Sequence, residues 1–363
     1  MSPLPDPIEA VSQRVDNFIS QRRKDAAAWG AEAELFVGAA ADAVQGGKRL
    51  RARFFLTGWR AVTGADRTAP PPADAVAVAG ALEIFHAAAL VHDDLIDNSD
   101  TRRGRPATHR ALEAAHGFRH WRGDAAAFGR SGAVLAGDLL VAWSDDLIEE
   151  GLRESVPDAA AQTRAVYAEM RRDVTLGQFL DVAEESAYVT QPDLDHAERA
   201  LRVASLKSAR YSIQQPLLIG AALAGADADQ CAALSDFGHP VGMAFQLRDD
   251  VLGVFGDAAV TGKPSGDDLR EGKRTVLIAY TRERLGAGPR RIFDEMIGDP
   301  TLDADQIASL QRTIVDTGAL ARTEELIADY ARAADRALSG ARLDNAAVGE
   351  LRDLARQATT RVA

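Results

Sequence analysis

Two aspartates near the end of an apolar segment are the first residues in this sequence that could carry out chemistry. In LEIFHAAALVHDDLIDNSDTRRGRP, from Leu82 to Pro106, Asp93 and Asp97 lie four residues apart. On a helix this spacing puts both carboxylates on one face, one turn apart. They repel each other unless a cation lies between them, and Mg²⁺ commonly joins one or two carboxylates to a substrate's phosphates. The pattern predicts a magnesium–phosphate site.

Arginines follow this acidic pair directly. Arg102, Arg103 and Arg105 could bind the phosphate oxygens that a metal leaves uncovered. The alternative is a solvated acidic helix end with an ordinary basic loop behind it, since Asp-Asp-x-x-Asp also occurs by chance. The acids end an alanine-rich run that should be buried, and this placement favours the metal site. His86 lies on the same helical stripe as Asp93, either as a ligand-binding group or as a histidine of the core.

A second acidic pair lies in the segment FQLRDDVLGVFGD. Asp249 and Asp250 again come near the end of an apolar helix. The segment TGKPSGDDLREGKRT follows, and it supplies Lys263 and Lys273 around a glycine-containing loop. This part of the chain repeats the combination of carboxylates and cations found in the first motif.

Two further basic segments complete the set. In GGKRLR, Lys48 and Arg51 follow two glycines at a helix start, where backbone N–H groups, the helix dipole and the cations all attract a phosphate. Lys207 and Ser208 lie within a helix in SLKSARYSIQQP. Each segment alone is weak evidence, because a lone helical lysine is usually just solvated. Two carboxylate clusters with several separate cation sites together indicate a diphosphate–metal assembly.

Helices must position these residues, because helical periodicity recurs almost from end to end. Alanine, leucine, arginine and glutamate dominate the composition, and all are strong helix formers. Short breaks with glycine or proline separate the segments, and none is long enough or biased enough to be a domain linker. We predict one all-α domain over residues 1–363. The predicted helices are 8–29, 32–44, 50–62, 73–97, 105–116, 128–150, 159–185, 194–224, 227–254, 275–285 and several after 290.

Composition excludes several classes of protein. The formal net charge of −12 makes nucleic acid an unsuitable partner. The single cysteine, Cys231, excludes an intramolecular disulfide and fits a reducing compartment. The N-terminal residues lack the pattern of a signal peptide, and no run of about 18 uncharged apolar residues suggests a membrane span. The sequence predicts a cytoplasmic protein.

Taken together, the motifs resemble those of the trans-isoprenyl diphosphate synthases, particularly bacterial geranylgeranyl and longer polyprenyl diphosphate synthases. They occur in the family's order and with similar spacing from residue 46 to residue 273. The resemblance implies a bundle of long helices around a central active-site cavity, of the isoprenoid synthase type, usually in a homodimer. The matching segments are GGKRLR (46–51), HDDLID with RRG (92–104), GQFLD (177–181), KSA (207–209), FQLRDD (245–250) and GKPSGDDLREGK (262–273).

The resemblance also implies a role for each candidate residue. Asp93 and Asp97 would ligate two magnesium ions and Asp249 a third, giving three ions in the ternary complex. The residues that would bind isopentenyl diphosphate are Lys48, Arg51, His86 and Arg103. The residues implied on the allylic side are Arg102, Lys207 and Lys263 for the diphosphate, Lys273 nearby, and Ser208 and Gln246 beside the developing allylic cation.

The implied reaction needs no protein nucleophile and no reducing cofactor. Metals and cations stabilise charge on the leaving diphosphate, so the allylic C–O bond ionises in a pocket that excludes water. The double bond of isopentenyl diphosphate then attacks, and a proton is lost, plausibly to the departing diphosphate. The allylic substrate is dimethylallyl, geranyl or farnesyl diphosphate.

The chain departs from the family pattern at three positions. Gly253 stands where the second acidic motif usually has a third acid, and Asp257, four residues farther on, cannot be assumed to replace it. Ala52 stands where proline often follows the first basic motif, and Ser208 where threonine is common. We expect activity, because the first two acids of the second motif remain, with the affinity for a third metal in question.

Two other functions remain open on the sequence. A class I terpene cyclase also ionises a prenyl diphosphate with an aspartate-rich motif, but it would not need the second diphosphate site that Lys48, Arg51, His86 and Arg103 suggest. A non-catalytic partner subunit would keep the fold, but such subunits commonly lose their aspartates, which this chain keeps in the first motif. An activity assay on the pure protein separates all three.

The length of the product is predicted from the helix before Asp93. A growing prenyl tail would run back along it at about 1.5 Å per residue. Ala89 and Ala88 leave the first turn open, whereas in the family aromatic residues there are associated with a C15 product. Phe85 comes about 12 Å along the helix, where it is either the floor of the tail channel or a core residue. The sequence therefore predicts geranylgeranyl diphosphate (C20), with a longer polyprenyl diphosphate as the alternative.

Overall fold

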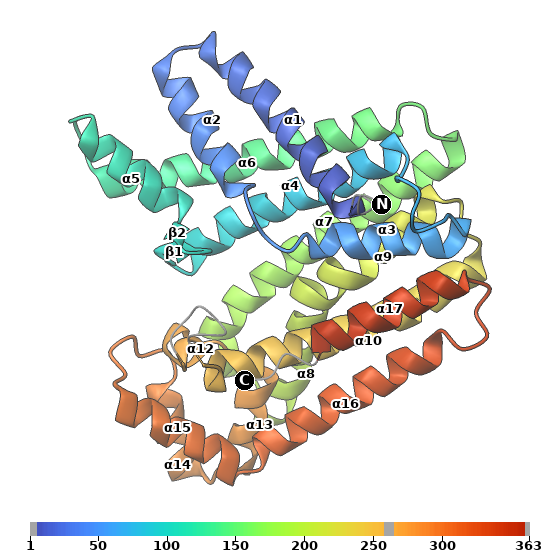
Figure 1. Ribbon diagram of the computed structural model, residues 1–363. Helices are drawn as coiled ribbons and strands as arrows, with labels where there is room; N and C mark the ends of the chain where they lie inside the picture. Colours follow the sequence, from blue (N-terminus) through green and yellow to red (C-terminus); the bar gives the residue numbers. More distant parts are fainter. Residues whose placement is uncertain (1–5, 258–264, 360–363) are drawn as a thin grey trace. The chain divides into compact units, whose positions relative to one another are not determined.

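The computed structural model describes residues 6–257 and 265–359, and almost all its regular structure is helical, as predicted (Figure 1). The only sheet in these residues is a two-stranded antiparallel ribbon, β1 (Thr101–Arg102) with β2 (Arg105–Pro106). The helices of the first part are α1 (Pro7–Ala27), α2 (Ala31–Ala43), α3 (Leu50–Thr63), α4 (Ala73–Ile96), α5 (Thr108–Phe118), α6 (Ala125–Leu152) and α7 (Pro157–Ala187). Those that follow are η1 (Tyr188–Thr190), η2 (Asp193–Asp195), α8 (His196–Val203), η3 (Ala204–Gln214), α9 (Gln215–Leu223), α10 (Ala228–Phe255), α12 (Asp267–Glu271), α13 (Val276–Arg284), α14 (Ala287–Met296), α15 (Ala304–Asp316), α16 (Ala319–Ala337) and α17 (Asn345–Thr359).

The contacts divide the chain into two compact units. Unit 1 comprises Met1–Leu56 and Ala65–Ala160, and unit 2 comprises Thr57–Gly64 and Ala161–Ala363. Helices α3 and α7 each contribute residues to both units. We describe each unit by itself, and the single domain predicted over residues 1–363 stays a prediction.

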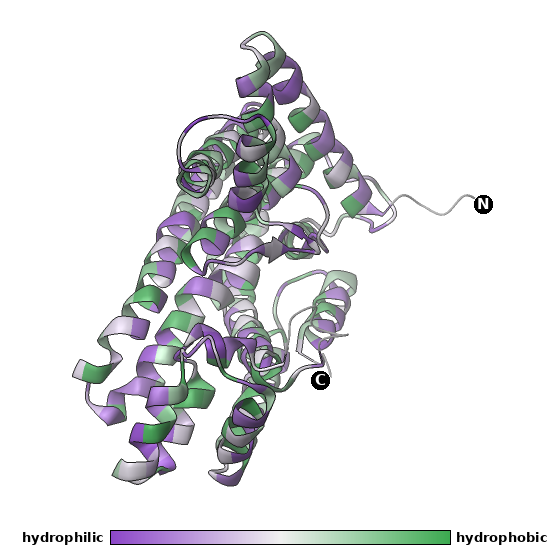
Figure 2. Ribbon diagram, turned by 90° about the vertical axis from the view of Figure 1, so that its left-hand side faces the viewer, coloured by the Kyte–Doolittle hydropathy of each residue, from purple (hydrophilic) through white to green (hydrophobic). Residues whose placement is uncertain are grey.

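Unit 1 is built around α4. Its alanine-rich run from Ala75 to Phe85 is buried without interruption, because small side chains let α1 and α6 pack closely on either side. The hydropathy colouring in Figure 2 shows the alternation along the helices that is typical of one buried stripe on each. Helix α4 ends where Asn98 takes a left-handed conformation, with φ +52°. This ending fixes the point at which the acidic side chains leave the core.

Unit 2 is built around α10, which packs against η3, α16 and α17. A large apolar core joins α10 to the helices that follow it, and fully buried members include Leu247, Val276 and Ile314. Close approach to η3 depends on glycine. A Cβ on Gly177 of α7 would lie 2.4 Å from the backbone N of Lys207, and one on Gly242 of α10 would lie 2.4 Å from the carbonyl O of Ala209. These two glycines hold η3 against its neighbours.

The predicted helices match observed helical segments to within about three residues, with two differences of detail. The helix predicted over 105–116 begins only at Thr108, because Arg103 and Gly104 both have positive φ and form a tight hairpin turn. The helix predicted over 194–224 runs without a break from His196 to Leu223, but its middle is not α-helical. It contains the π-helical segment η3, and Pro216 just beyond it has no N–H to donate to an α-helical ladder.

Two of the described helices, α4 and α6, are long and apolar enough to cross a membrane by length and composition alone. For α4, 78% of the most apolar window is buried inside the protein, as in the core helix of a water-soluble protein. For α6 the buried share is 28%, so much of an apolar helix is left uncovered in the single chain.

The contact between α5 and α6 leads to a test of packing in unit 1. A Cβ on Gly129 of α6 would lie 2.3 Å from the carbonyl O of His109, so we expect Gly129→Ala to destabilise the protein by about 1–3 kcal/mol. Gly38 of α2 has open space around it, and Gly38→Ala should stabilise by about 0.5–1 kcal/mol. Urea unfolding of both variants measures the two effects, and equal changes in the same direction would contradict the packing described here.

Candidate functional site

The first acidic motif lies at the C-terminal end of α4. Asp93 and Asp94 are in its last turn and Asp97 is its C-cap, while that turn contains no basic residue. The C-terminus of a helix carries partial negative charge, so three carboxylates there need a cation nearby. Arg102 on β1 supplies one. Its Nε donates to Asp94 Oδ1 at 2.7 Å, and its guanidinium lies 3.5 Å from Asp93 Oδ2.

Asp94 is the buried member of this motif. Burial raises the pKa of its carboxyl group, while the hydrogen bond and charge of Arg102 oppose that change. Its buried carboxylate fixes the position of Arg102, whereas Asp93 and Asp97 are half-buried. Asp94 is thus the acid that positions the arginine, and the metal-binding roles of Asp93 and Asp97 stay predictions.

The hairpin places Arg103 against the first basic motif. Its two-residue turn, Arg103–Gly104, points the arginine at the loop before α3, where Nη1 donates to the carbonyl O of Gln45 at 2.9 Å. A Cβ on Gly47 would lie 2.8 Å from Nη2 of Arg103, and Gly47 itself has φ +87°. Glycine at position 47 is required both by the turn and by the guanidinium that lies against it.

A buried carboxylate holds the basic motif itself. Glu83 of α4 is 4% exposed, and its Oε1 accepts from the backbone N–H of Ala52 in the first turn of α3 at 3.0 Å. Its Oε2 lies 3.7 Å from Nη1 of Arg49, whose Nη2 donates to the carbonyl O of Val44 at 3.2 Å. Glu83 thus contacts both Arg49 and the backbone of Ala52, and so holds the segment that carries the basic side chains. Within it, Lys48 is exposed and Arg51 is buried.

His86 lies among the arginines gathered by these contacts. Its pKa is well below the ordinary value, because the ring is desolvated and because it lies in the field of four guanidinium groups. The arginines responsible are Arg51, Arg103, Arg102 and Arg49. His86 is therefore neutral near pH 7. The structure brings together in unit 1 the basic motif, His86 and the hairpin arginines, although His86 lies 35 positions after Arg51 and 16 before Arg102.

The residues predicted to set product length lie along the same helix. Ala88 is 1% exposed and Phe85 is 6% exposed, while Ala89 is half-buried. No bulky side chain stands on α4 between Phe85 and His92 apart from His86 and Leu90. Ala88 and Ala89 carry only methyl groups, and the burial of Phe85 fits either of its two predicted roles, so the chain-length assignment stays a prediction.

In unit 2, Lys207 and Ser208 lie on the π-helical segment η3. Lys207 Nζ forms an ion pair with Asp181 of α7, and Ser208 is half-buried. A π-helix has i→i+5 in place of i→i+4 hydrogen bonds and is frequently found at functional sites. The sequence placed both residues on a helix correctly, and the π-helical form was not predicted.

The second acidic motif lies on α10. Asp250 is 7% exposed and accepts from Nε2 of Gln246 at 2.6 Å. The pKa of its carboxyl group is raised to about 8, mainly by burial and also by the charges of Asp268 and Asp249, while the hydrogen bond from Gln246 opposes the rise. Lys273 lies 3.3 Å from Asp268 Oδ1. Lys263, also predicted here, lies outside the described residues.

Glu185 of unit 2 lies close to both Lys207 and Lys273. Burial raises the pKa of Glu185 on α7, and Asp181 raises it further. The charges of Lys207 and Lys273 lower it, so both lysines act on the same carboxylate.

The donor atoms of both motifs suit a magnesium ion. They are carboxylate oxygens, the ligands that Mg²⁺ prefers, and each set ends a helix without a basic residue in its last turn. Within residues 6–257 and 265–359, no three histidine, cysteine or acidic side chains form a preassembled metal cage. Magnesium sites completed by substrate phosphates and water need no such cage.

Comparison with known proteins gives the relationship that these contacts suggest. The polyprenyl synthetase family model matches residues 34–314. The chain belongs to the polyprenyl synthetase family. The geranylfarnesyl diphosphate synthase of Aeropyrum pernix is 34% identical over 81% of this chain and 83% of its own length. The geranylgeranyl diphosphate synthase of Sulfolobus acidocaldarius is 32% identical over 73% of this chain and 72% of its own.

A solved structure of the family is also similar. The geranylgeranyl pyrophosphate synthase of Corynebacterium glutamicum, in complex with isoprenyl diphosphate and magnesium, is 36% identical to this chain. It aligns with a TM-score of 0.91 and covers 99% of this chain and 100% of its own. The resemblance expected from the motifs is confirmed, as is the all-α fold.

Sequence reasoning missed four buried or half-buried acids that position the family's motifs. Asp94 and Asp181 stood inside quoted motifs, but nothing in their spacing showed that they hold Arg102 and Lys207. Asp268 also stood in a quoted motif. Glu83 had one signal, since an acid within the apolar run of α4 is rarely buried unless it is paired.

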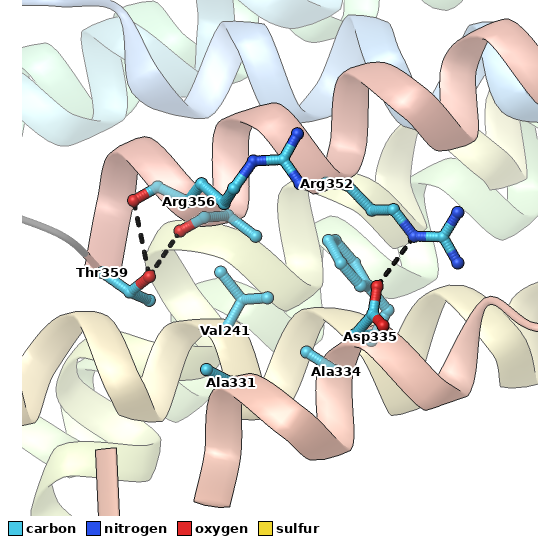
Figure 3. Close-up of a pocket in the computed structure, with 9 residues that line it drawn as sticks. Val241, Ala331, Ala334, Asp335, Arg352, Arg356 and Thr359 are labelled. Atoms are coloured by element: carbon cyan, nitrogen blue, oxygen red, sulfur yellow. Dashed lines mark hydrogen bonds and ion pairs between the residues drawn. The ribbon is translucent and has the colours of Figure 1, made fainter. Parts of the chain in front are cut away.

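A separate cavity in unit 2 does not fit this chemistry. It has a volume of about 250 Å³, and α10, α16 and α17 line it mainly with apolar side chains (Figure 3). Its two arginines already pair with acids, Arg352 with Asp335 at 2.9 Å and Arg356 with Asp353. None of the predicted site residues lines it.

The environment of His86 predicts how stability depends on pH. Because its pKa is lower in the folded than in the unfolded protein, the unfolded state binds more protons below about pH 6.5. The wild type should lose free energy of unfolding as pH falls through that value, and His86→Gln should lose less, by up to about 1.4 kcal/mol per pH unit. Urea unfolding at pH 7.5 and 5.5 measures this difference. Equal losses in the two proteins would mean that His86 titrates alike in both states.

Proposed function

We propose that this protein condenses isopentenyl diphosphate with dimethylallyl, geranyl or farnesyl diphosphate to give geranylgeranyl diphosphate. Membership of the family makes the chain a trans-prenyltransferase. The observation that carries the proposal is the pair of charge clusters, one in each unit, that both combine acids with fixed cations. A reaction between two diphosphates needs two such places, whereas a terpene cyclase needs one.

Isopentenyl diphosphate binds the basic side chains of unit 1 in this proposal. Lys48, Arg51 and Arg103 supply positive charge to the diphosphate, and His86 joins them. The lowered pKa of His86 supports this, because after burial its main causes are the charges of four arginines near the ring. A neutral imidazole there can donate a hydrogen bond to a phosphate oxygen.

Magnesium is held by the acids that end α4 and by the second motif on α10. We assign Asp93 and Asp97 to two ions and Asp249 to a third. Support comes from the placement of these acids in the last turn and at the C-cap of α4, with Arg102 held beside them by Asp94. When bound, magnesium supplies positive charge to the leaving diphosphate.

The allylic diphosphate is held from unit 2 and by Arg102. Lys207 is oriented by Asp181 and stands opposite the charge that develops on the leaving group, with Lys263 and Lys273 assigned beside it. Ser208 and Gln246 lie next to the allylic cation in the proposal. Gln246 is oriented by its hydrogen bond to Asp250, so its carbonyl oxygen rather than its NH₂ group is available to face positive charge.

Carbon–carbon bond formation then follows from the substrates. The allylic C–O bond breaks with both electrons leaving on diphosphate, the double bond of isopentenyl diphosphate attacks the cation, and a proton passes to the departing diphosphate. The side chains named here bind, orient and exclude water. None forms a covalent bond.

We propose C20 as the main product because the first turn of α4 before Asp93 is open. Ala88 and Ala89 carry only methyl groups, and Phe85 is the next large apolar side chain toward the N-terminus with its ring buried. Relatives of similar identity are named for C20 and C25 products, so identity alone does not decide chain length.

A homodimer in the cytoplasm is the proposed form of the protein. Helix α6 supports the dimer, since Val134 and Leu135 are 43% and 58% exposed on a helix with a long apolar stretch that is only 28% buried. A second copy of the same surface would cover such a face, as is usual in symmetric dimers. The single cysteine agrees with a reducing compartment.

The metal assignment predicts the effect of removing one carboxylate. Asp93→Ala should lower turnover at least about a hundredfold, because the leaving diphosphate loses a key source of charge stabilisation. Turnover is measured with isopentenyl and farnesyl diphosphates in the presence of magnesium. Asp146→Ala, which removes an exposed acid of α6 that pairs with Arg22, is the control and should keep turnover. Normal turnover for Asp93→Ala would end the assignment.

The chain-length assignment predicts a change of product. Ala88→Phe should shorten the product toward C15, and Phe85→Ala should lengthen it if Phe85 is the floor of the tail channel. Because Ala88 is buried, Ala89→Phe at the half-buried neighbour is the parallel variant. Chromatography of the dephosphorylated products gives their lengths. If active Ala88→Phe and Ala89→Phe proteins both make the wild-type product, the tail does not follow α4.

A further inference from the structure

The turn that carries Lys48 is held in an uncommon backbone conformation. Arg49, between Lys48 and the first residue of α3, has φ +50°. A residue with a side chain rarely adopts this left-handed conformation, which persists where surrounding contacts fix it. The direction of Lys48 therefore depends on the contacts that hold Arg49 and the start of α3.

Glu83 of α4 makes such contacts on both sides of Leu50 and Arg51. Its buried carboxylate lies 3.7 Å from Nη1 of Arg49 and accepts from the N–H of Ala52 at 3.0 Å. Ala52 is the third residue of α3, where a backbone N–H has no partner within its own helix. Glu83 thus caps the N-terminus of α3 from α4.

The residue at position 52 makes this cap possible. Proline, which often stands there in the resembling family, has no N–H and could not donate to Glu83. The contact is therefore a property of this chain and not of family members that have proline. It also means that a carboxylate of the protein, and not a phosphate, is bound to this N–H at the start of α3.

We propose that Glu83 is a positioning residue for isopentenyl diphosphate. By holding Arg49 and the N–H of Ala52, it fixes the turn from which Lys48 and Arg51 bind the diphosphate. Glu83 itself does not touch the substrate, because it is 4% exposed and has the same sign of charge. The inference rests on the proposed function, which assigns this diphosphate to the basic motif.

Removing the hydrogen-bond donor alone tests the proposal. Ala52→Pro deletes the N–H and leaves Glu83 charged, and proline is tolerated in the first turn of a helix. We expect KM for isopentenyl diphosphate to rise about fivefold or more, because a buried acceptor loses its donor. Turnover and KM for farnesyl diphosphate should stay within about twofold of wild type, since only the binding of one substrate changes. Ala52→Gly keeps the N–H, so this matched control should retain the wild-type constants.

A double-mutant cycle distinguishes the lost hydrogen bond from the shape of proline. Glu83→Ala should raise the same KM, and adding Ala52→Pro to it should have little further effect, because the N–H no longer has its partner. Glu83→Gln keeps an oxygen that can accept from Ala52, so its KM should lie closer to the wild-type value than that of Glu83→Ala. Circular dichroism of each variant reports folding.

An unchanged KM for isopentenyl diphosphate in folded Ala52→Pro would overturn the proposal. Equal effects of Ala52→Pro with and without Glu83 would also overturn it, because proline would then act through its shape alone. Should Ala52→Pro not fold, the two Glu83 variants decide, since equal KM values in Glu83→Gln and Glu83→Ala would exclude a role for the hydrogen bond. If the wild type did not condense the two diphosphates, the proposed function would be wrong instead.

Discussion

Repulsion between carboxylates that lie close together is the constraint on which the rest of this structure depends. Carboxylates gather at the end of α4 and near the end of α10, where the helix dipole adds to their repulsion. Each unit also contains a cation that an acid holds in place. Asp94 holds Arg102, and Asp181 holds Lys207. Because these acids hold the cations in place before any ligand arrives, little reorganisation is needed when a metal–diphosphate assembly binds.

Much of this could be predicted from the sequence, because it depends on spacing within one helix. The long apolar runs predict helices α4 and α10 and where they end. The four-residue separation of Asp93 and Asp97 predicts that both carboxylates lie on one face of α4. The prediction failed at Arg105, where a residue after glycine and before proline belongs to a hairpin strand and not to a helix. Local patterns predict an element well only when no turn competes for the same residues.

The rest could not be predicted, because it depends on which distant segments meet. Glu83 and Ala52 are 31 positions apart, and nothing in either segment shows that a carboxylate accepts from that N–H. Gly253 is a second example, because the sequence shows only that glycine stands where the family usually has an acid. The structure places the side chain of Asp268 beside that position.

The hydrogen bond from Ala52 to Glu83 has a consequence for how this chain can change over generations. Proline, which often stands at position 52 in the family, has no N–H to donate. A mutation to proline here would take one donor from a buried carboxylate, a loss of about 1–3 kcal/mol. A second change that gives Glu83 another donor would offset this loss, so the two positions are energetically coupled in this chain.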